Sequence, residues 1–169
     1  MWKFLVVLST SVALIAGTAS RAGADTTATF TLTAGGLSIS APTGSVSLGS
    51  QPVSNGSSTI TGSLGVVTVS DQRGGATSWT ASVISTAFTP TAGPADPASN
   101  ASYGAGAITA SATVVATAVS AANLTGVSTV VTGASTGVSS ASWNPTISVV
   151  IPGNFAPGVY GATITHSVA

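Results

Sequence analysis

Very few side chains in this sequence could carry out chemistry. The acidic residues are Asp25, Asp71 and Asp96, glutamate and cysteine are absent, and His166 is the one histidine. Glycoside cleavage needs a pair of carboxyl groups across the scissile bond, and metal sites need clusters of Asp, His, Cys or Glu. A Ser-His-Asp set could be drawn from His166, Asp71 and a serine, but no G-x-S-x-G motif occurs. We therefore expect no enzymatic activity, no metal and no cofactor.

The residues best suited to specific interactions are concentrated between Val67 and Val83. Asp71 and Arg73 are the only close pair of opposite charges, and a pair of glycines begins at Gly74. Asp71 can accept hydrogen bonds from a turn backbone, Arg73 can pair with it, and glycine can adopt positive φ. Trp79 opens the returning strand, where a tryptophan is more often part of the core than a ligand platform. The pattern predicts a hairpin turn organised by an ion pair.

The elements that would position these residues are β-strands. Apolar and hydroxylated residues alternate with period two, which is typical of half-buried strands. Turn residues separate roughly nine such runs, and small Ala, Val and Thr side chains suit two sheets packed face to face. The fold class predicted is all-β, an antiparallel immunoglobulin-like β-sandwich. The predicted strands are 28–33, 37–40, 45–48, 64–70, 79–88, 107–118, 127–132, 146–151 and 159–168.

The first residues predict export. Lys3 gives a positive start, residues 4–16 are mostly apolar, and small residues end at Ala24, as in a secretory signal peptide. The apolar run is shorter than the ~20 residues that span a bilayer. We expect a signal peptide over 1–24 and a single domain over 25–169, which is 169 − 24 = 145 residues. Its charge is +1 − 3 = −2 without a basic patch, so neither nucleic acid nor an anionic membrane is expected as a partner. No later apolar stretch is long enough to predict a membrane span.

One segment departs from the strand pattern. Residues 89–106 contain Pro90, Pro94 and Pro97 and few apolar side chains. Long connections of this kind are either solvated loops or binding loops. The sequence leaves both open.

A family resemblance rests mainly on the hairpin region. The pattern Val-x-Val-x-Asp-x-Arg-Gly ends at Gly74, and Trp79 and Val83 follow it. This arrangement resembles the WxL-domain proteins of Gram-positive surfaces. Residues 37–42, 48–50 and 157–165 are also similar to that family's opening and closing strands.

The resemblance implies a β-sandwich that attaches non-covalently to the cell wall through peptidoglycan. Two motif positions differ from the family: the first reads Trp79-Thr80-Ala81, and the second reads His166-Ser167-Val168, with His in place of Trp. We therefore expect a secreted protein associated with wall polysaccharide, with other surface proteins as further partners. The family-motif positions are Asp71, Arg73, Gly74, Trp79 and His166.

An alternative function follows from charge. Near-zero net charge favours self-association, and strand edges without Lys or Glu lack the usual protection against edge pairing. The chain could therefore be a self-assembling subunit of a surface layer or fibre.

Two further expectations concern aromatic and imidazole side chains. Trp79 and Trp143 adjoin alternating strands and should be buried. His166 shares one strand face with Ile164 and Val168, so it either occupies a core position or is left in water by fraying of the chain end.

Overall fold

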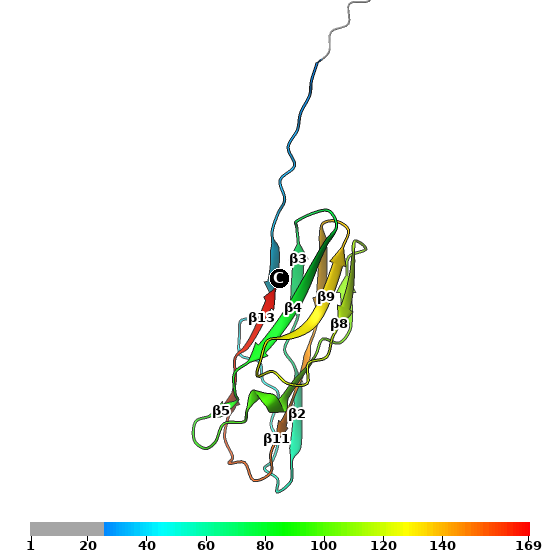
Figure 1. Cartoon of the computed structure of the whole chain (residues 1–169). Helices are drawn as coiled ribbons and strands as arrows, with labels where there is room; N and C mark the ends of the chain where they lie inside the picture. The colour runs from blue at the N-terminus through cyan, green and yellow to red at the C-terminus, as the bar shows by residue number, and fades with distance from the viewer. Residues whose placement is uncertain (1–25) are drawn as a thin grey trace, which may run out of the picture. The chain divides into compact units, whose positions relative to one another are not determined.

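The computed structural model in Figure 1 describes residues 26–169. The expected signal peptide and its cleavage point lie outside the described residues. The chain divides into two units, Met1–Leu32 and Thr33–Ala169, and each is described by itself. In the first unit, residues 26–32 are irregular and their side chains are exposed.

The second unit is an antiparallel β-sandwich, which confirms the predicted fold class. The described residues form thirteen strands and one short 3-10 helix rather than roughly nine strands. The elements are β1 (Leu37–Ser40), β2 (Ser58–Ser63), β3 (Val67–Asp71), β4 (Thr77–Ser85), β5 (Thr89–Pro90), η1 (Ala98–Asn100), β6 (Ala101–Gly104), β7 (Ile108–Ala110), β8 (Val114–Ala118), β9 (Ser128–Ser135), β10 (Ser139–Trp143), β11 (Thr146–Ile151), β12 (Tyr160–Gly161) and β13 (Ile164–Val168).

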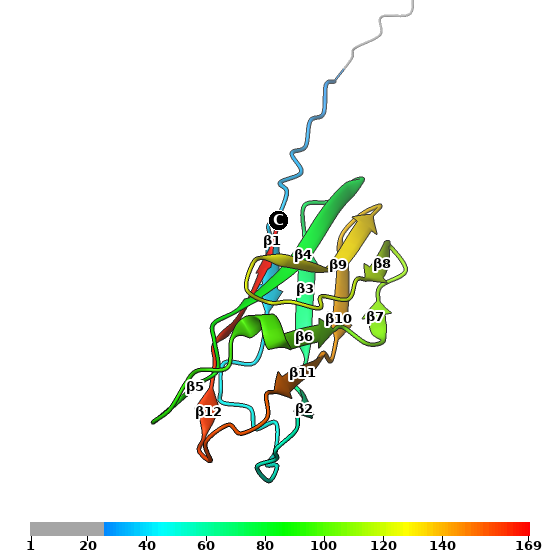
Figure 2. The same ribbon diagram turned by 60° about the horizontal axis from the view of Figure 1, so that its bottom comes forward.

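Two four-stranded sheets make up the body of the sandwich. One has the order β1-β3-β10-β7 and the other β13-β4-β9-β8, and the two layers are visible in Figures 1 and 2. Alternate residues of each strand point inward, so the apolar half of each period-two pattern forms the core. Its members include Val67, Val69, Trp79, Ala81, Val83, Val131, Ala141 and Trp143.

A third sheet, β2-β11-β6, continues the first one past a bend. β2 leads into β3, β10 into β11 and β6 into β7, in the same side-by-side order. Three residues separate β2 from β3, and three separate β6 from β7, whereas only two separate β10 from β11. An extra residue on a strand is a β-bulge, which bends it. Gly65 (φ 88°) and Gly106 (φ 72°) take the left-handed conformation that these bulges require.

The expectation that 89–106 is an irregular loop is wrong for most of the segment. Phe88 and Asp96 exchange backbone hydrogen bonds of 2.8 and 2.9 Å, and β6 pairs with β11. Ala98, Ala101 and Tyr103 are buried, and only residues 91–95 form an exposed tip. The sequence pattern did not reveal this structure because the strand partners lie far along the chain, in β11 for β6 and in β12 for β5.

Two other predicted strands are absent. Residues 28–33 and 45–48 alternate as strands do, yet no strand pairing among the described residues includes them. A strand needs a neighbour for its backbone hydrogen bonds, and the alternating pattern alone does not supply one.

Candidate functional site

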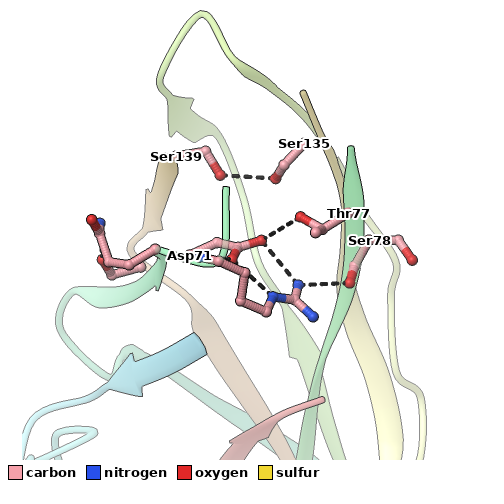
Figure 3. Close-up of polar contacts among 8 residues, drawn as sticks. Asp71, Thr77, Ser78, Ser135 and Ser139 are labelled. Atoms are coloured by element: carbon pink, nitrogen blue, oxygen red, sulfur yellow. Dashed lines mark hydrogen bonds and ion pairs between the residues drawn. The ribbon is translucent and has the colours of Figure 1, made fainter. Parts of the chain in front are cut away.

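The connection from β3 to β4, which crosses from one four-stranded sheet to the other, is held by a carboxylate that is fully buried (Figure 3). Asp71 Oδ1 accepts from Arg73 Nε at 2.9 Å and from the Arg73 backbone N–H at 3.1 Å. Its Oδ2 accepts from Arg73 Nη2 at 2.9 Å and from Thr77 Oγ1 at 2.8 Å. The predicted ion pair is therefore confirmed, and the buried charge is satisfied on both oxygens. The predicted hairpin is wrong, because β3 pairs with β1 and β10 whereas β4 pairs with β13 and β9 in the other sheet.

These contacts fix the ionisation of the pair. The hydrogen bonds from Arg73 hold the pKa of Asp71 well below its usual range, although burial acts in the opposite direction. The hydrogen bond to Asp71 in turn raises the pKa of Arg73. Gly74 and Gly75, at φ 73° and 67°, supply the positive φ that the turn needs. The residues thus act as a structural clamp on the β3–β4 connection.

Arg73 also closes one edge of a sheet. Thr80 and Ala169 exchange backbone hydrogen bonds of 2.8 and 3.1 Å, which extends the β4–β13 pairing to the last residue. Backbone groups two residues apart point to the same side of a strand, so the carbonyl of Ser78 is the next one along that edge. Arg73 Nη2 donates to this carbonyl at 2.8 Å (Figure 3). The guanidinium therefore covers the edge where no strand pairs in the described chain.

Trp79 belongs to the core, as expected. Its side chain is 2% exposed, and it lies opposite Gly133 of β9 in the strand register. A Cβ atom on Gly133 would lie 2.6 Å from Trp79 Nε1 and still closer to the indole carbons. The indole therefore packs flat over a position that only glycine leaves open. The Nε1 group is buried and has no hydrogen-bond partner among the described residues.

His166 ends a chain of hydrogen bonds through the core. Trp143 Nε1 donates to Tyr103 Oη at 2.9 Å, and Tyr103 Oη lies 3.1 Å from His166 Nε2. An indole N–H can only donate, so the tyrosine oxygen accepts there. The direction of the Tyr103–His166 hydrogen bond depends on the imidazole tautomer.

Burial shifts the pKa values of His166 and Tyr103 in this series of hydrogen bonds. It lowers the pKa of His166, and it raises the pKa of Tyr103 to about 12, although the bond from Trp143 acts the other way. His166 is half-buried with Ile164 and Val168, while Thr165 and Ser167 are exposed. The core position is confirmed, and the frayed chain end is wrong because Ala169 remains paired with Thr80.

The predicted positions therefore do not converge on one site. Asp71, Arg73 and Gly74 form the clamp on the β3–β4 connection, Trp79 packs on Gly133, and His166 belongs to the hydrogen-bonded series with Tyr103 and Trp143. Within residues 26–169 there is no group of three or more side chains that could hold a metal ion. In the same part of the chain, no helix has both the length and the apolar character to cross a membrane.

The alignment of surface hydroxyl groups on one sheet could not be located from the sequence. On the outer face of the β1-β3-β10-β7 sheet, Ser40, Thr68, Ser142 and Thr109 lie side by side across four strands. A second row crosses three strands as Ser38, Ser70 and Ser140. These side chains are exposed or half-buried, and strand geometry spaces them ~4.8 Å across and ~6.7 Å along the strands. We call these seven residues the hydroxyl face.

Comparison of the chain with protein-family models, with curated proteins and with solved structures found no match. The resemblance to WxL-domain proteins therefore stays a prediction from the motif residues.

Proposed function

We propose that this chain is a secreted, non-enzymatic surface protein that associates non-covalently with cell-wall polysaccharide, including peptidoglycan, through its WxL-like β-sandwich. The observation that supports the proposal is the hydroxyl face. It contains no charged residue, and it is held on a rigid sheet whose other side packs into the core.

The chemistry of this face suits a neutral glycan. A hydroxyl group can donate one hydrogen bond and accept two, so a row of Ser and Thr can match either kind of group on a sugar. Wall glycans offer hydroxyl and amide groups at regular intervals along an extended chain. Rows at fixed spacing could therefore bind several sugars at once. Because the hydroxyl face carries no charge, its contribution to binding should change little between low salt and ~0.5 M salt.

The buried motif positions have another role in this proposal. Asp71 and Trp79 are inaccessible to a polymer, so they would hold the sheets that carry the face. Of the motif residues in the β3–β4 region, Arg73 is the one that would contact the wall, since its side chain is 33% exposed.

Sedimentation with purified cell walls tests the proposal. The variant Thr68→Val, Ser70→Ala, Ser142→Ala removes three hydroxyls without adding charge. At ~0.5 kcal/mol for each hydrogen bond, the loss is ~1.5 kcal/mol, or about tenfold in affinity. The matched control is Thr80→Val, Ser82→Ala, Thr132→Val on the outer face of the other sheet. Equal binding by the two variants, or no sedimentation of the unaltered protein, would refute the proposal.

A second candidate is a self-assembling subunit of a surface layer or fibre. The observation that favours it is an uncharged strand edge at β8 together with residues 26–33, which alternate as a strand does but have no strand partner in the described chain. Wall binding and assembly have separate readouts, sedimentation with walls and particle mass in solution, and each can occur without the other.

A further inference from the structure

Residues 26–33 have the pattern of a strand. They read Thr-Thr-Ala-Thr-Phe-Thr-Leu-Thr, so period two places Ala28, Phe30 and Leu32 on one side and threonines on the other. Phe30 is 86% exposed and Leu32 is 87% exposed. Large apolar side chains in a row are usually covered by a partner, and this segment has none among the described residues.

The outer edge of β8 offers unpaired backbone groups. Thr136 N–H donates to the Thr113 carbonyl and Val119 N–H to the Val130 carbonyl, both at 2.8 Å. Residues 113 and 119 therefore point their backbone groups toward β9, as does every second residue between them. The N–H and C=O groups of Ala116 and Ala118 consequently point away from β9. In the described chain, β9 is the only strand that pairs with β8.

This edge lacks the features that usually block strand addition. Residues 114–118 include no Lys, Glu or Pro, which are the common guards of sheet edges. The other side of the same sheet differs, because Arg73 covers the carbonyl of Ser78 there. β8 is an end strand of its sheet in the pairing order and in both ribbon views.

We propose that residues 26–33 of one copy add as a strand to the outer edge of β8 in a second copy. The two-sided pattern of the segment fits this position. Its apolar side chains would face the layer between the sheets, beside the half-buried Ala116 of β8 and Ile108 of β7. Its threonines would extend the row Thr80, Thr132 and Thr117 on the outer surface.

The short link between the segment and β1 favours pairing with β8 of a second copy over pairing with β8 of the same copy. Backbone bonds of 2.8 and 2.9 Å between residues 35–36 and Gln72 fix the start of β1 beside β3. Only Ala34 lies between Gly35 and a segment ending at Thr33, and the two Cα–Cα steps of this link span only about 7 Å. β1 and β7 occupy opposite edges of a four-stranded sheet, about 14 Å apart, and β8 adjoins β7. A 7 Å link is shorter than this distance, which favours β8 of a second copy for a segment that pairs as far as Thr33.

The contact joins two different surfaces, so it is heterologous. Two copies can exchange segments and close as a dimer, or each copy can add to the next and form a fibre. The inference holds whether or not the protein binds walls.

Cross-linking tests the contact directly, because the chain contains no cysteine. A Thr31→Cys variant is mixed with a Thr117→Cys variant under mild oxidation, and the mixed disulfide dimer is measured on a non-reducing gel. The matched control replaces the second partner with Thr165→Cys, which is exposed on β13 at the other end of the same sheet. We expect at least fivefold more dimer with Thr117→Cys. Equal yields with the two partners would overturn the assignment to β8.

The mass of the chain from Asp25 to Ala169 in solution provides the second test. We expect a mass above the monomer that rises with concentration, and a monomer for Phe30→Ser, Leu32→Ser. Ala116→Pro removes an outward N–H and leaves the bonds to β9 in place, so it should also give a monomer. If the unaltered chain is monomeric at every concentration, or if the Phe30→Ser, Leu32→Ser variant assembles equally well, the proposal is wrong. Sedimentation of that variant with walls reports wall binding separately.

Discussion

Replacing Gly133 with alanine should disrupt the packing of Trp79. The added Cβ would lie 2.6 Å from Trp79 Nε1 and closer still to Cε2 and Cζ2, which no real side-chain contact tolerates. The indole is 2% exposed and lies between the two sheets, so it has no free space to enter. Either the strands shift locally or the indole leaves its site.

The size of the expected loss in unfolding free energy follows from these two outcomes. Local overpacking costs about 1–3 kcal/mol, and complete loss of a buried tryptophan's packing costs about 3–5 kcal/mol. Gly133 does not have a positive φ, so alanine is compatible with the backbone and returns about 0.5–1 kcal/mol. The expected net loss in unfolding free energy is about 1–4 kcal/mol.

Urea unfolding with two companion variants measures this effect. Gly104→Ala is the matched control: it is also a strand glycine without positive φ, and its added Cβ would meet nothing within 4 Å. It should leave stability unchanged or raise it by about 0.5–1 kcal/mol. In a Trp79→Leu background, Gly133→Ala should cost much less, because the clashing ring is gone. An unchanged urea midpoint for Gly133→Ala, or the same loss with and without Trp79, would refute the packing argument.

Three further predictions concern titrating groups and their partners. Because burial lowers the pKa of His166, the unfolded chain takes up the proton first below about pH 6.5, and the unfolding free energy should fall from pH 8 to pH 5. His166→Phe should remove that part of the fall in urea midpoints. An equal fall in both proteins would contradict the prediction. Thr77→Val removes a hydrogen bond to the buried Asp71 carboxylate and should cost about 1–3 kcal/mol by urea unfolding; no loss would show that Arg73 alone satisfies the charge. Burial raises the pKa of Asp96, so the charged carboxylate is disfavoured in the folded state at pH 7. Asp96→Asn should therefore raise the melting temperature at pH 7 and lose this advantage as the pH falls through the folded pKa of Asp96. A gain in melting temperature that persists at low pH would contradict this reasoning.

The local features could be predicted from the sequence. The alternating pattern gave the all-β class and the bounds of β1 and β11, since each strand's own residues determine which side chains point inward. The Asp71–Arg73 turn was predictable as well, because its partners are two residues apart in the chain and the glycines that follow can adopt the positive φ that the turn uses.

The long-range contacts depended on the tertiary structure. Strand register brings Trp79 opposite Gly133 and links Trp143, Tyr103 and His166, which are 40 and 63 residues apart in successive pairs. Register also aligns serines and threonines from four strands into the hydroxyl face. A period-two pattern determines the face of a sheet to which a side chain points, but it does not determine the neighbouring strand. Packing of the whole core selects that neighbour, and residues 28–33 show that the same pattern can occur without one.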